Sequence, residues 1–459
     1  MYLDKLIKIK NNNEKILLIG FGQEIKQFYN WLTEVVGIDQ EFIVIADKNS
    51  VEVTKSKLIT GENYLSALDE DFVMVFKAPG VWSLKPEFEA YRARNGEDSI
   101  LSSLVFFLER FRENVLMITG TKGKTTTSSW SKHFLLNSNI TGKVEYCGNT
   151  TNISPYQFWT ELEIDKLDTF FVIEISSFQL QDLGYSKISP KYSIITNLYI
   201  DHLDQHNNKD EYWCAKDNIF KFQYTTDYLV ITKQVFENIV SRKVNLISKL
   251  KIVKEQDIEE FKSRFTSGLI GDHNWSNMIE AYYMASIIAH VDDVQSVINT
   301  FEPPKGRLEL IKTKLIDGKT IYFYNDNTAT EPDAVIAAIN ALEQVKDTEN
   351  ILILSGKWKN GNHLKLAEKI KESINNSKML KVYYFGEVGQ VLNEMINNNK
   401  QEFISFKQWL SDKNDFHNIV KSSITNNINL LFSPSGSSFD EFKNYIERGE
   451  MYIKWVETV

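Results

Sequence analysis

The stretch VLMITGTKGKTTT at residues 115–127 brings a strand, a loop and the start of a helix together in one short run. The apolar residues 115–118 predict a buried strand, and the glycines that follow end it. Gly120 and Gly123 allow backbone N–H groups to turn inward around phosphate oxygens, and the N-terminus of the helix expected next adds partial positive charge. We therefore predict a loop that binds nucleotide phosphates. A plain glycine turn with solvated lysines is the alternative.

The roles of the loop residues follow from the general phosphate-binding pattern. Lys124 would reach the outer phosphates, and the Thr125 hydroxyl would hold Mg²⁺. The pattern has a glycine where this chain has Ile118, and the chain supplies Gly120 instead. The expected nucleotide-binding residues are Gly120, Thr121, Lys122, Gly123, Lys124, Thr125 and Thr126.

On both sides of this stretch, short apolar runs alternate with helical patterns, which is typical of an α/β fold with largely parallel sheets. The 459 residues are about three times the length of an average domain of roughly 150 residues. The clearest interruption is PPKG at 303–306, because adjacent prolines and a glycine resist helix and sheet interiors. We predict three α/β domains: a Rossmann-like domain at 1–110, a central domain of the P-loop ATPase type at 111–303, and a second Rossmann-like domain at 304–459.

The composition narrows the class of protein. With 52 basic and 61 acidic residues the net charge is -9, which argues against a protein that coats nucleic acid or an anionic membrane. Two cysteines, Cys147 and Cys214, are too few for a disulfide scaffold and form no CxxC metal motif. No apolar run approaches the roughly 18 residues of a membrane helix. We expect a cytoplasmic monomer whose partners are small molecules, not nucleic acid or a membrane.

Two polar features follow strands of the central region. Glu174 ends the apolar run 170–173, and ligands collect at the carboxyl ends of strands in doubly wound sheets. With Thr125 and phosphate oxygens it could complete a Mg²⁺ site, although a solvated strand-end acid is the alternative. The run DHLDQH at 201–206 gathers two histidines and two aspartates. Zinc is therefore an alternative metal there, but no HExxH motif or neighbouring cysteine supports it.

A lysine follows bulky apolar residues in YWCAK at 212–216. A buried lysine loses its charge readily and becomes nucleophilic, so Lys216 is a candidate for chemistry. An exposed, solvated lysine is the simpler alternative.

In their order along the chain, these motifs resemble those of the Mur ligases, the ATP-dependent enzymes that form amide bonds in peptidoglycan precursor synthesis. The resemblance runs from about residue 15 to the end. The matching segments are 120–126, 174–179, 201–204, Lys216, GDHNWSN at 271–277 and FSPSGSSFDEFKNY at 432–445, the last being similar to the signature of the branch that adds D-glutamate.

The resemblance implies a mechanism and its residues. ATP would phosphorylate a substrate carboxylate, and an amine would then displace phosphate from the acyl phosphate. The residues implied in catalysis are Lys124, His202, Lys216 and Arg307. Two Mg²⁺ ions are implied, with Thr125, Glu174, His202 and a Lys216 carbamylated by CO₂ as the metal-site residues. Asn274 and Asn277 would lie on the adenine side, Arg307 at the phosphates and Asp326 at the ribose.

The same matching implies the substrates, UDP-N-acetylmuramoyl-L-alanine and glutamate, in particular the D-isomer. The implied substrate-binding residues are Gly22, Asp47, Asn149 and Gln179 for the UDP-linked acceptor, and Thr330, Lys359, Ser438 and Tyr445 for glutamate. A Mur-type ligase with another amino acid, such as L-glutamate, or another acceptor is the alternative. A non-catalytic nucleotide-binding switch is the alternative from a different class.

Four residues depart from the family pattern. Thr328 replaces a lysine and Tyr445 a phenylalanine near the amino-acid pocket. Ile25 stands in place of the third glycine of a dinucleotide motif, which argues against NAD. Glu24 would lie near the UDP diphosphate, where a small hydroxyl is expected, and Lys48 and Lys77 could offset its charge.

Overall fold

The structure is a computed structural model that describes residues 2–53, 55–148, 151, 153–162, 168–199, 206, 208–267, 271–358, 363–375, 380–397, 405–411 and 413–459. These residues form two compact units, one of residues 1–267 with 276–301 and one of residues 268–275 with 302–459. Across the described ranges, no helix is both long and apolar enough to cross a membrane.

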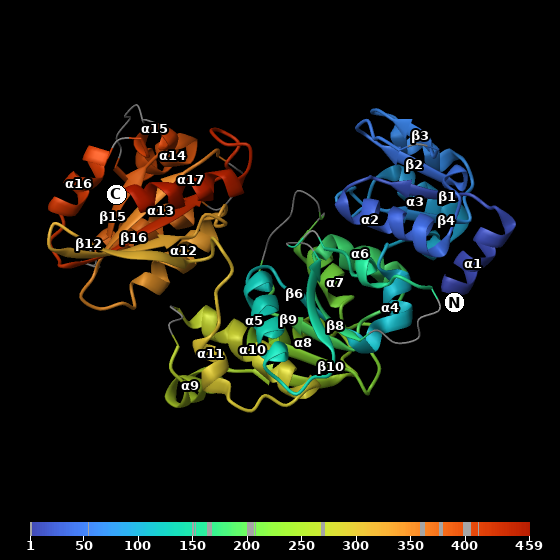
Figure 1. Cartoon of the computed structure of the whole chain (residues 1–459), viewed down its shortest axis with the longest axis horizontal. Helices are drawn as coiled ribbons and strands as arrows, with labels where there is room; N and C mark the ends of the chain where they lie inside the picture. The colour runs from blue at the N-terminus through green and yellow to red at the C-terminus, as the bar shows by residue number, and fades with distance from the viewer. Residues whose placement is uncertain are drawn as a thin grey trace. The chain divides into compact units, whose positions relative to one another are not determined.

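The first unit opens with a five-stranded parallel sheet in the order β3-β2-β1-β4-β5. The order reverses beside β1, and ligands bind at the carboxyl ends of strands at such a point. Helices flank the sheet (Figure 1). Its elements are α1 (Tyr2–Asn12), β1 (Ile16–Ile19), α2 (Gln23–Trp31), β2 (Ile43–Asp47), β3 (Lys57–Thr60), β4 (Met74–Lys77), α3 (Pro86–Asn95), β5 (Ile100–Leu101) and α4 (Val105–Phe111).

A six-stranded parallel sheet follows, in the order β11-β10-β9-β6-β8-β7. The predicted strand at 115–118 is confirmed as part of β6, which is buried along its whole length. The elements are β6 (Val115–Thr119), α5 (Lys124–Leu136), β7 (Lys143–Gly148), β8 (Thr169–Glu174), α6 (Ser177–Tyr185), β9 (Tyr192–Ile195), α7 (Lys209–Asp217), β10 (Tyr228–Thr232), α8 (Lys233–Ser241), β11 (Lys249–Val253), α9 (Glu255–Arg264), α10 (Asp272–Ile288) and α11 (Val294–Asn299).

An aromatic cluster joins these two sheets into one core. Trp31 of α2 lies 4.6 Å from Trp159 and 4.7 Å from Tyr156, ring centroid to ring centroid, and Phe28 lies 4.8 Å from Phe76 of β4. All five rings are buried. These aromatic residues come from α2, β4 and the segment after β7. Because the rings pack against one another in the core, they hold the first sheet to the second.

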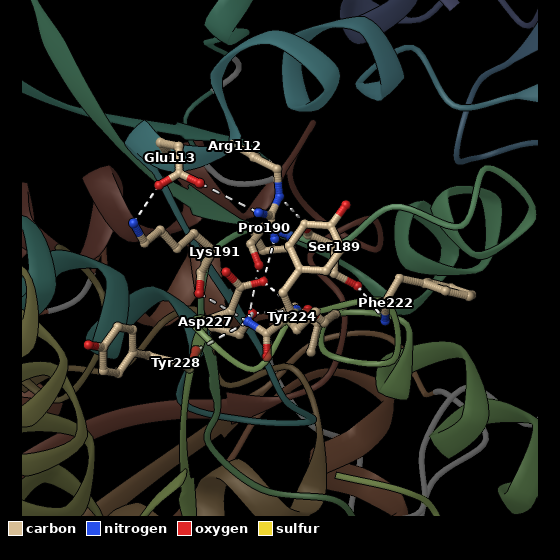
Figure 2. A network of polar contacts seen from close by, with 12 residues as sticks. Arg112, Glu113, Ser189, Pro190, Lys191, Phe222, Tyr224, Asp227 and Tyr228 are labelled. Carbon is tan, nitrogen blue, oxygen red and sulfur yellow. Dashed lines mark hydrogen bonds and ion pairs between the residues drawn. The ribbon is translucent and has the colours of Figure 1, made fainter. Parts of the chain in front are cut away.

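The amino-terminal edge of the central sheet carries a polar network (Figure 2). Arg112, just before β6, pairs with the buried carboxylate of Asp227 before β10, and its Nε donates to the Ser189 carbonyl at 3.2 Å. The Gln223 side-chain amide donates to four acceptors between 3.0 and 3.2 Å. The Tyr224 backbone N–H donates to Asp227 at 2.7 Å. These bonds tie the starts of three strands together.

The second unit holds a five-stranded sheet in the order β12-β13-β16-β14-β15, in which only the β12–β13 pair is antiparallel. Separate apolar clusters cover its two faces. The elements are β12 (Glu309–Ile316), β13 (Lys319–Asn325), α12 (Pro332–Leu342), β14 (Glu349–Ser355), α13 (His363–Asn375), β15 (Leu380–Tyr384), α14 (Gly386–Asn397), α15 (Phe406–Trp409), α16 (Lys413–Lys421), β16 (Asn427–Ser435) and α17 (Tyr445–Thr458).

The α/β prediction with largely parallel sheets is confirmed. The described residues form three sheets, while compactness groups the first two in one unit. The division at residues 110 and 303 stays a prediction.

Candidate active site

The phosphate-binding loop connects the end of β6 to α5 through two glycines with positive φ. Gly120 has φ +151° and Gly123 has φ +82°. A Cβ atom at Gly120 would lie 1.9 Å from Thr196 Oγ1, and one at Gly123 would lie 2.5 Å from Asn277 Oδ1. Both positions therefore require glycine for conformation and for space. The expected neighbour Asn277 thus lies beside the loop.

Residues after β9 hold the loop in place. The N–H groups of Thr121 and Lys122 donate to the carbonyl oxygen of Asn197 at 3.0 Å and to its Oδ1 at 2.9 Å, respectively. Thr196 Oγ1 donates to the Lys122 carbonyl at 2.6 Å. The N-cap of α5 is Gly123, which has no side chain to cap the first turn. The first amides of this helix thus suit an anion, which fits a nucleotide phosphate.

Two lysines meet at the loop. Lys124 Nζ donates to the carbonyls of Gly120 and Thr121, each at 3.0 Å. Lys216, on α7 and only 1% exposed, donates to the same Gly120 carbonyl at 3.0 Å and lies 4.7 Å from the Tyr212 ring centroid. The exposed-lysine alternative for Lys216 is therefore wrong. The ammonium groups of both lysines thus meet at one carbonyl oxygen of the loop.

Two of the residues expected to bind Mg²⁺ lie at the same edge of the sheet. Glu174 ends β8, is 2% exposed and accepts a hydrogen bond from the Tyr146 hydroxyl at 2.8 Å. Ile118, two residues before Gly120, is its register partner in β6. Thr125 is buried in the first turn of α5. The Thr125 hydroxyl and the Glu174 carboxylate are both oxygen ligands of the kind that Mg²⁺ prefers. Burial makes the solvated-acid alternative for Glu174 wrong.

The histidine cluster is described only at its end. Asp201, His202 and Asp204 lie outside the described residues, so the roles expected for His202 stay predictions. His206 is buried, stacks on Phe178 and lies 3.2 Å from Ser177 Oγ through Nε2. Among the described side chains, no three histidines, cysteines or acids gather into a metal-binding group.

The first unit contains a hollow of about 620 Å³, its open mouth included, where the N-terminal sheet meets the central one. Its lining includes Gln23, Glu24, Gln27, Gly148, Ser154 and Gln179. The enclosed part of this space is about 140 Å³, below the roughly 300–1,000 Å³ typical of small-molecule sites, so it would hold only part of a substrate.

The residues expected to bind the acceptor differ in their position relative to this hollow. Gln179 lies in its wall, and Gly22 is the exposed N-cap of α2. Asp47 ends β2 and accepts hydrogen bonds from the N–H groups of Phe21 at 2.6 Å and Asn49 at 2.7 Å, so it holds the loop after β1. Asn149 lies outside the described residues.

The second unit contains the other expected nucleotide residues. Asp326 follows β13 and accepts from Ser433 Oγ at 2.7 Å and from the Leu308 N–H at 3.0 Å. Burial raises the pKa of Asp326 to about 7, while the Arg307 charge opposes that rise. Arg307 is half-buried, and Asn274 lies in the first turn of α10.

The residues expected to bind glutamate also lie in this unit. Ser438 is buried, Thr330 is half-buried and Tyr445 at the start of α17 is 43% exposed, whereas Lys359 lies outside the described residues. Thr328, which replaces the family's lysine, donates through Oγ1 to the Gly306 carbonyl at 2.9 Å. The Thr328 side chain therefore stabilises the turn at Gly306.

Comparisons with known proteins identify the family. The Mur ligase middle domain model matches residues 118–285. The UDP-N-acetylmuramoylalanine–D-glutamate ligase of Lawsonia intracellularis is 30% identical over 416 residues, which cover 89% of this chain and 85% of that protein. The chain belongs to the Mur ligase family.

Other relatives extend the match. The ligase of the same name from Clostridium botulinum strain Hall is 28% identical and aligns over 97% of both chains. The solved MurF ligase of Thermotoga maritima, in complex with ADP, matches this Mur ligase with a TM-score of 0.56 and 14% identity over 99% of both chains. The UDP-N-acetylmuramate–alanine ligase of Thermotoga maritima gives a TM-score of 0.53 at 17% identity, covering 97% of this chain and 99% of that one. The protein is thus an ATP-dependent ligase that forms amide bonds, and Mur ligases use ATP and Mg²⁺.

Sequence reasoning missed one buried cation of this Mur ligase. Arg448 of α17 is fully buried and donates through Nε to Asn327 Oδ1 at 2.8 Å, through one terminal nitrogen to the Gly436 carbonyl at 3.0 Å and through the other to the Asn327 carbonyl at 3.2 Å. Burial lowers the pKa of Arg448 to about 10. It joins the loop after β13 to the loop after β16. Its place just after the 432–445 signature was the available signal.

Proposed function

We propose that this Mur ligase joins D-glutamate to the alanyl carboxylate of UDP-N-acetylmuramoyl-L-alanine, in the cytoplasm and as a monomer. The meeting of Lys124 and Lys216 at the Gly120 carbonyl carries the proposal, and the hollow lined by Gln179 supports it. The names of the relatives from Lawsonia and Clostridium support the choice of substrates.

The proposed reaction has two steps. A carboxylate oxygen of the acceptor attacks the γ-phosphorus of ATP, and ADP leaves. The glutamate amine then attacks the acyl carbon of the acyl phosphate, loses a proton and releases inorganic phosphate. Lys124 and the amides of the loop stabilise the charge on the transferred phosphoryl group.

Mg²⁺ bound by Thr125 and Glu174 would neutralise charge on the phosphate oxygens. Arg307 would add a planar, bidentate donor for phosphate, and Asp326 an acceptor for the ribose hydroxyls.

Lys216 is proposed to act as a carbamate. Its ammonium group would lose a proton, the resulting amine would add to the carbon of CO₂, and the adduct would lose a second proton, so that a cation becomes an anion. The change would relieve the repulsion between two ammonium groups that share one carbonyl oxygen. The product would be a ligand for a second Mg²⁺, together with His202.

Glutamate is proposed to bind in the second unit through Thr330, Lys359, Ser438 and Tyr445. Arg448 supports this site by fixing the two loops that carry Thr330 and Ser438. Because Thr328 is bonded to Gly306 and supplies no cation, a changed amino-acid preference such as L-glutamate is the second candidate.

One assay tests these proposals. Purified protein, ATP, Mg²⁺ and UDP-N-acetylmuramoyl-L-alanine are incubated with a panel of D- and L-amino acids, and the product is identified by mass. We expect a product heavier by one glutamyl residue with the D-isomer. A product with another amino acid would replace glutamate. Phosphate release that needs neither acceptor nor amino acid would favour the nucleotide-switch alternative.

A further inference from the structure

Glu24 lies where the family pattern has a small hydroxyl, and its contacts are with the protein. It belongs to the first turn of α2 and lines the hollow together with Gln179 of α6. Its Oε2 accepts a hydrogen bond from Gln179 Nε2 at 2.7 Å, and its Oε1 accepts one from Ser103 Oγ at 2.5 Å. Both carboxylate oxygens thus accept hydrogen bonds, one from α6 of the central sheet and one from the segment between β5 and α4.

The contact with Gln179 fixes the orientation of that amide. Gln179 Oε1 accepts from both the backbone N–H and the hydroxyl of Ser176, each at 3.0 Å, in the capping box of α6. Glu24 takes one N–H of the same amide at its other end. The amide is therefore held at its oxygen by α6 and at its nitrogen by α2, with one N–H left for a ligand in the hollow.

The charges around Glu24 pair with each other. Lys77 lies 2.8 Å from Asp182, with both side chains buried, and it also donates to the carbonyls of Ala78 and Val81. Lys77, which was expected to neutralise the charge of Glu24, thus forms its ion pair with Asp182. Lys48, the second lysine expected to do so, pairs with Glu62 at 3.0 Å. Burial raises the pKa of Glu24, Asp182 adds to the rise, and the hydrogen bonds and Lys77 oppose it.

We propose that Glu24 is a positioning residue for the acceptor: it holds the Gln179 amide against the wall of the hollow and acts on the acceptor through that amide. The inference rests on the proposed function, since it takes the UDP-linked acceptor to occupy this hollow. It also assigns a function to the residue at which this chain departs from the family pattern. Glu24 would link the N-terminal sheet to Gln179, the α6 side chain that contacts the acceptor.

Glutamine is the informative replacement at this position. In Glu24→Gln the side-chain oxygen can still accept from Gln179, and the new N–H can donate to Ser103. Glu24→Ala removes both bonds. A positioning role therefore predicts that Gln retains function where Ala loses it, whereas a role for negative charge predicts that both fail.

The test is a double-mutant cycle of Glu24→Ala and Gln179→Ala, read by calorimetric binding of UDP-N-acetylmuramoyl-L-alanine and by steady-state kinetics. Each single variant should weaken acceptor binding about tenfold with kcat changed less than about twofold, which is the loss of one hydrogen bond to a charged group. The double variant should bind about as weakly as either single variant, because Glu24 acts through Gln179. Glu24→Gln should bind within about threefold of the wild type.

Glu34→Ala removes the same side chain at an exposed position on the same helical run and serves as the control. A double variant weakened about a hundredfold, or an acceptor affinity unchanged in Glu24→Ala, would overturn the inference while the proposed function stands. If Glu24→Ala does not fold, Glu24→Gln with and without Gln179→Ala decides, since failure of Glu24→Gln to retain acceptor binding also overturns it. Wild type that binds the acceptor without turnover would refute only the proposed function, and absence of binding would refute both.

Discussion

The two edges of the central sheet both carry basic and acidic side chains, but the partners of these side chains differ. At the amino-terminal edge Arg112 pairs with Asp227 (Figure 2). The Gln223 amide nitrogen there has four acceptors from the protein. At the carboxyl-terminal edge Lys124 and Lys216 rest on a backbone carbonyl, and α5 starts without a side-chain cap. A buried ion pair with its hydrogen bonds stabilises the fold, whereas the uncapped first amides of a helix suit an anionic ligand.

The largest effect should come from the carboxyl-terminal edge. Lys124→Ala should lower kcat/KM by about a thousandfold, because a loop lysine stabilises the transferred phosphoryl group. Phosphate release and the urea midpoint of unfolding are measured together. The midpoint should stay near that of the wild type, and Lys132→Ala, further along α5, should leave both unchanged. A large drop in the midpoint would mean that Lys124 is structural.

The amino-terminal edge should show the reverse behaviour. Arg112→Met leaves the Asp227 carboxylate buried without its cation and should lower the free energy of unfolding by about 3 kcal/mol. At a temperature where the variant is folded, kcat/KM should match the wild type. Adding Asp227→Asn should recover part of the stability, because the uncompensated charge is then gone. Equal loss of activity in the folded variant would erase the distinction between the two edges.

Lys216→Ala sharpens the comparison within the carboxyl-terminal edge. Loss of the proposed carbamate should lower kcat about a hundredfold, and acetate or bicarbonate at millimolar concentration should restore part of it. Lys216→Arg is the control, since arginine keeps the charge but cannot form the carbamate. If the arginine variant were as active as the wild type, carbamylation would be excluded, because arginine restores only the charge and its position.

Asp326 extends the comparison to the second unit. Its pKa is raised to about 7 in the folded state, so the folded state prefers the proton, and stability falls as pH rises from the unfolded pKa towards 7. Between pH 5 and 7 the loss should be about 2 kcal/mol, and Asp326→Asn should remove that slope. Urea unfolding at a series of pH values checks it. The same slope in the variant would assign the effect to another group.

The elements that could be predicted from the sequence are those encoded locally. The strand, glycine loop and helix at 115–127 depend on neighbours in the chain, and the strand-end position of Glu174 follows from one apolar run. The bonds that orient the site join distant residues. Glu24 and Gln179 are 155 positions apart, and Arg448 is 121 positions from Asn327. No local pattern predicts such pairs, because the packing of whole helices brings them together.

The antiparallel edge strand β12 was not predicted, because its sequence does not alternate between apolar and polar residues. β12 reads ELIKTKLI, and its side chains alternate between exposed and half-buried along most of its length. Sequence reasoning uses period-two alternation of apolar and polar residues, whereas the apolar residues here come in the adjacent pairs Leu310–Ile311 and Leu315–Ile316. The strand begins three residues after the PPKG segment, which itself predicts a domain boundary.

The aromatic cluster around Trp31 and Trp159 limits how this chain can be divided by recombination or by protein engineering. A fragment that stops at residue 110 would keep Phe28, Trp31 and Phe76 and lose Tyr156 and Trp159, their partners across the core. Large rings left in water favour self-association. Expressed alone, the N-terminal segment should therefore precipitate or form oligomers, and a graft between relatives should preserve the first 267 residues as one piece.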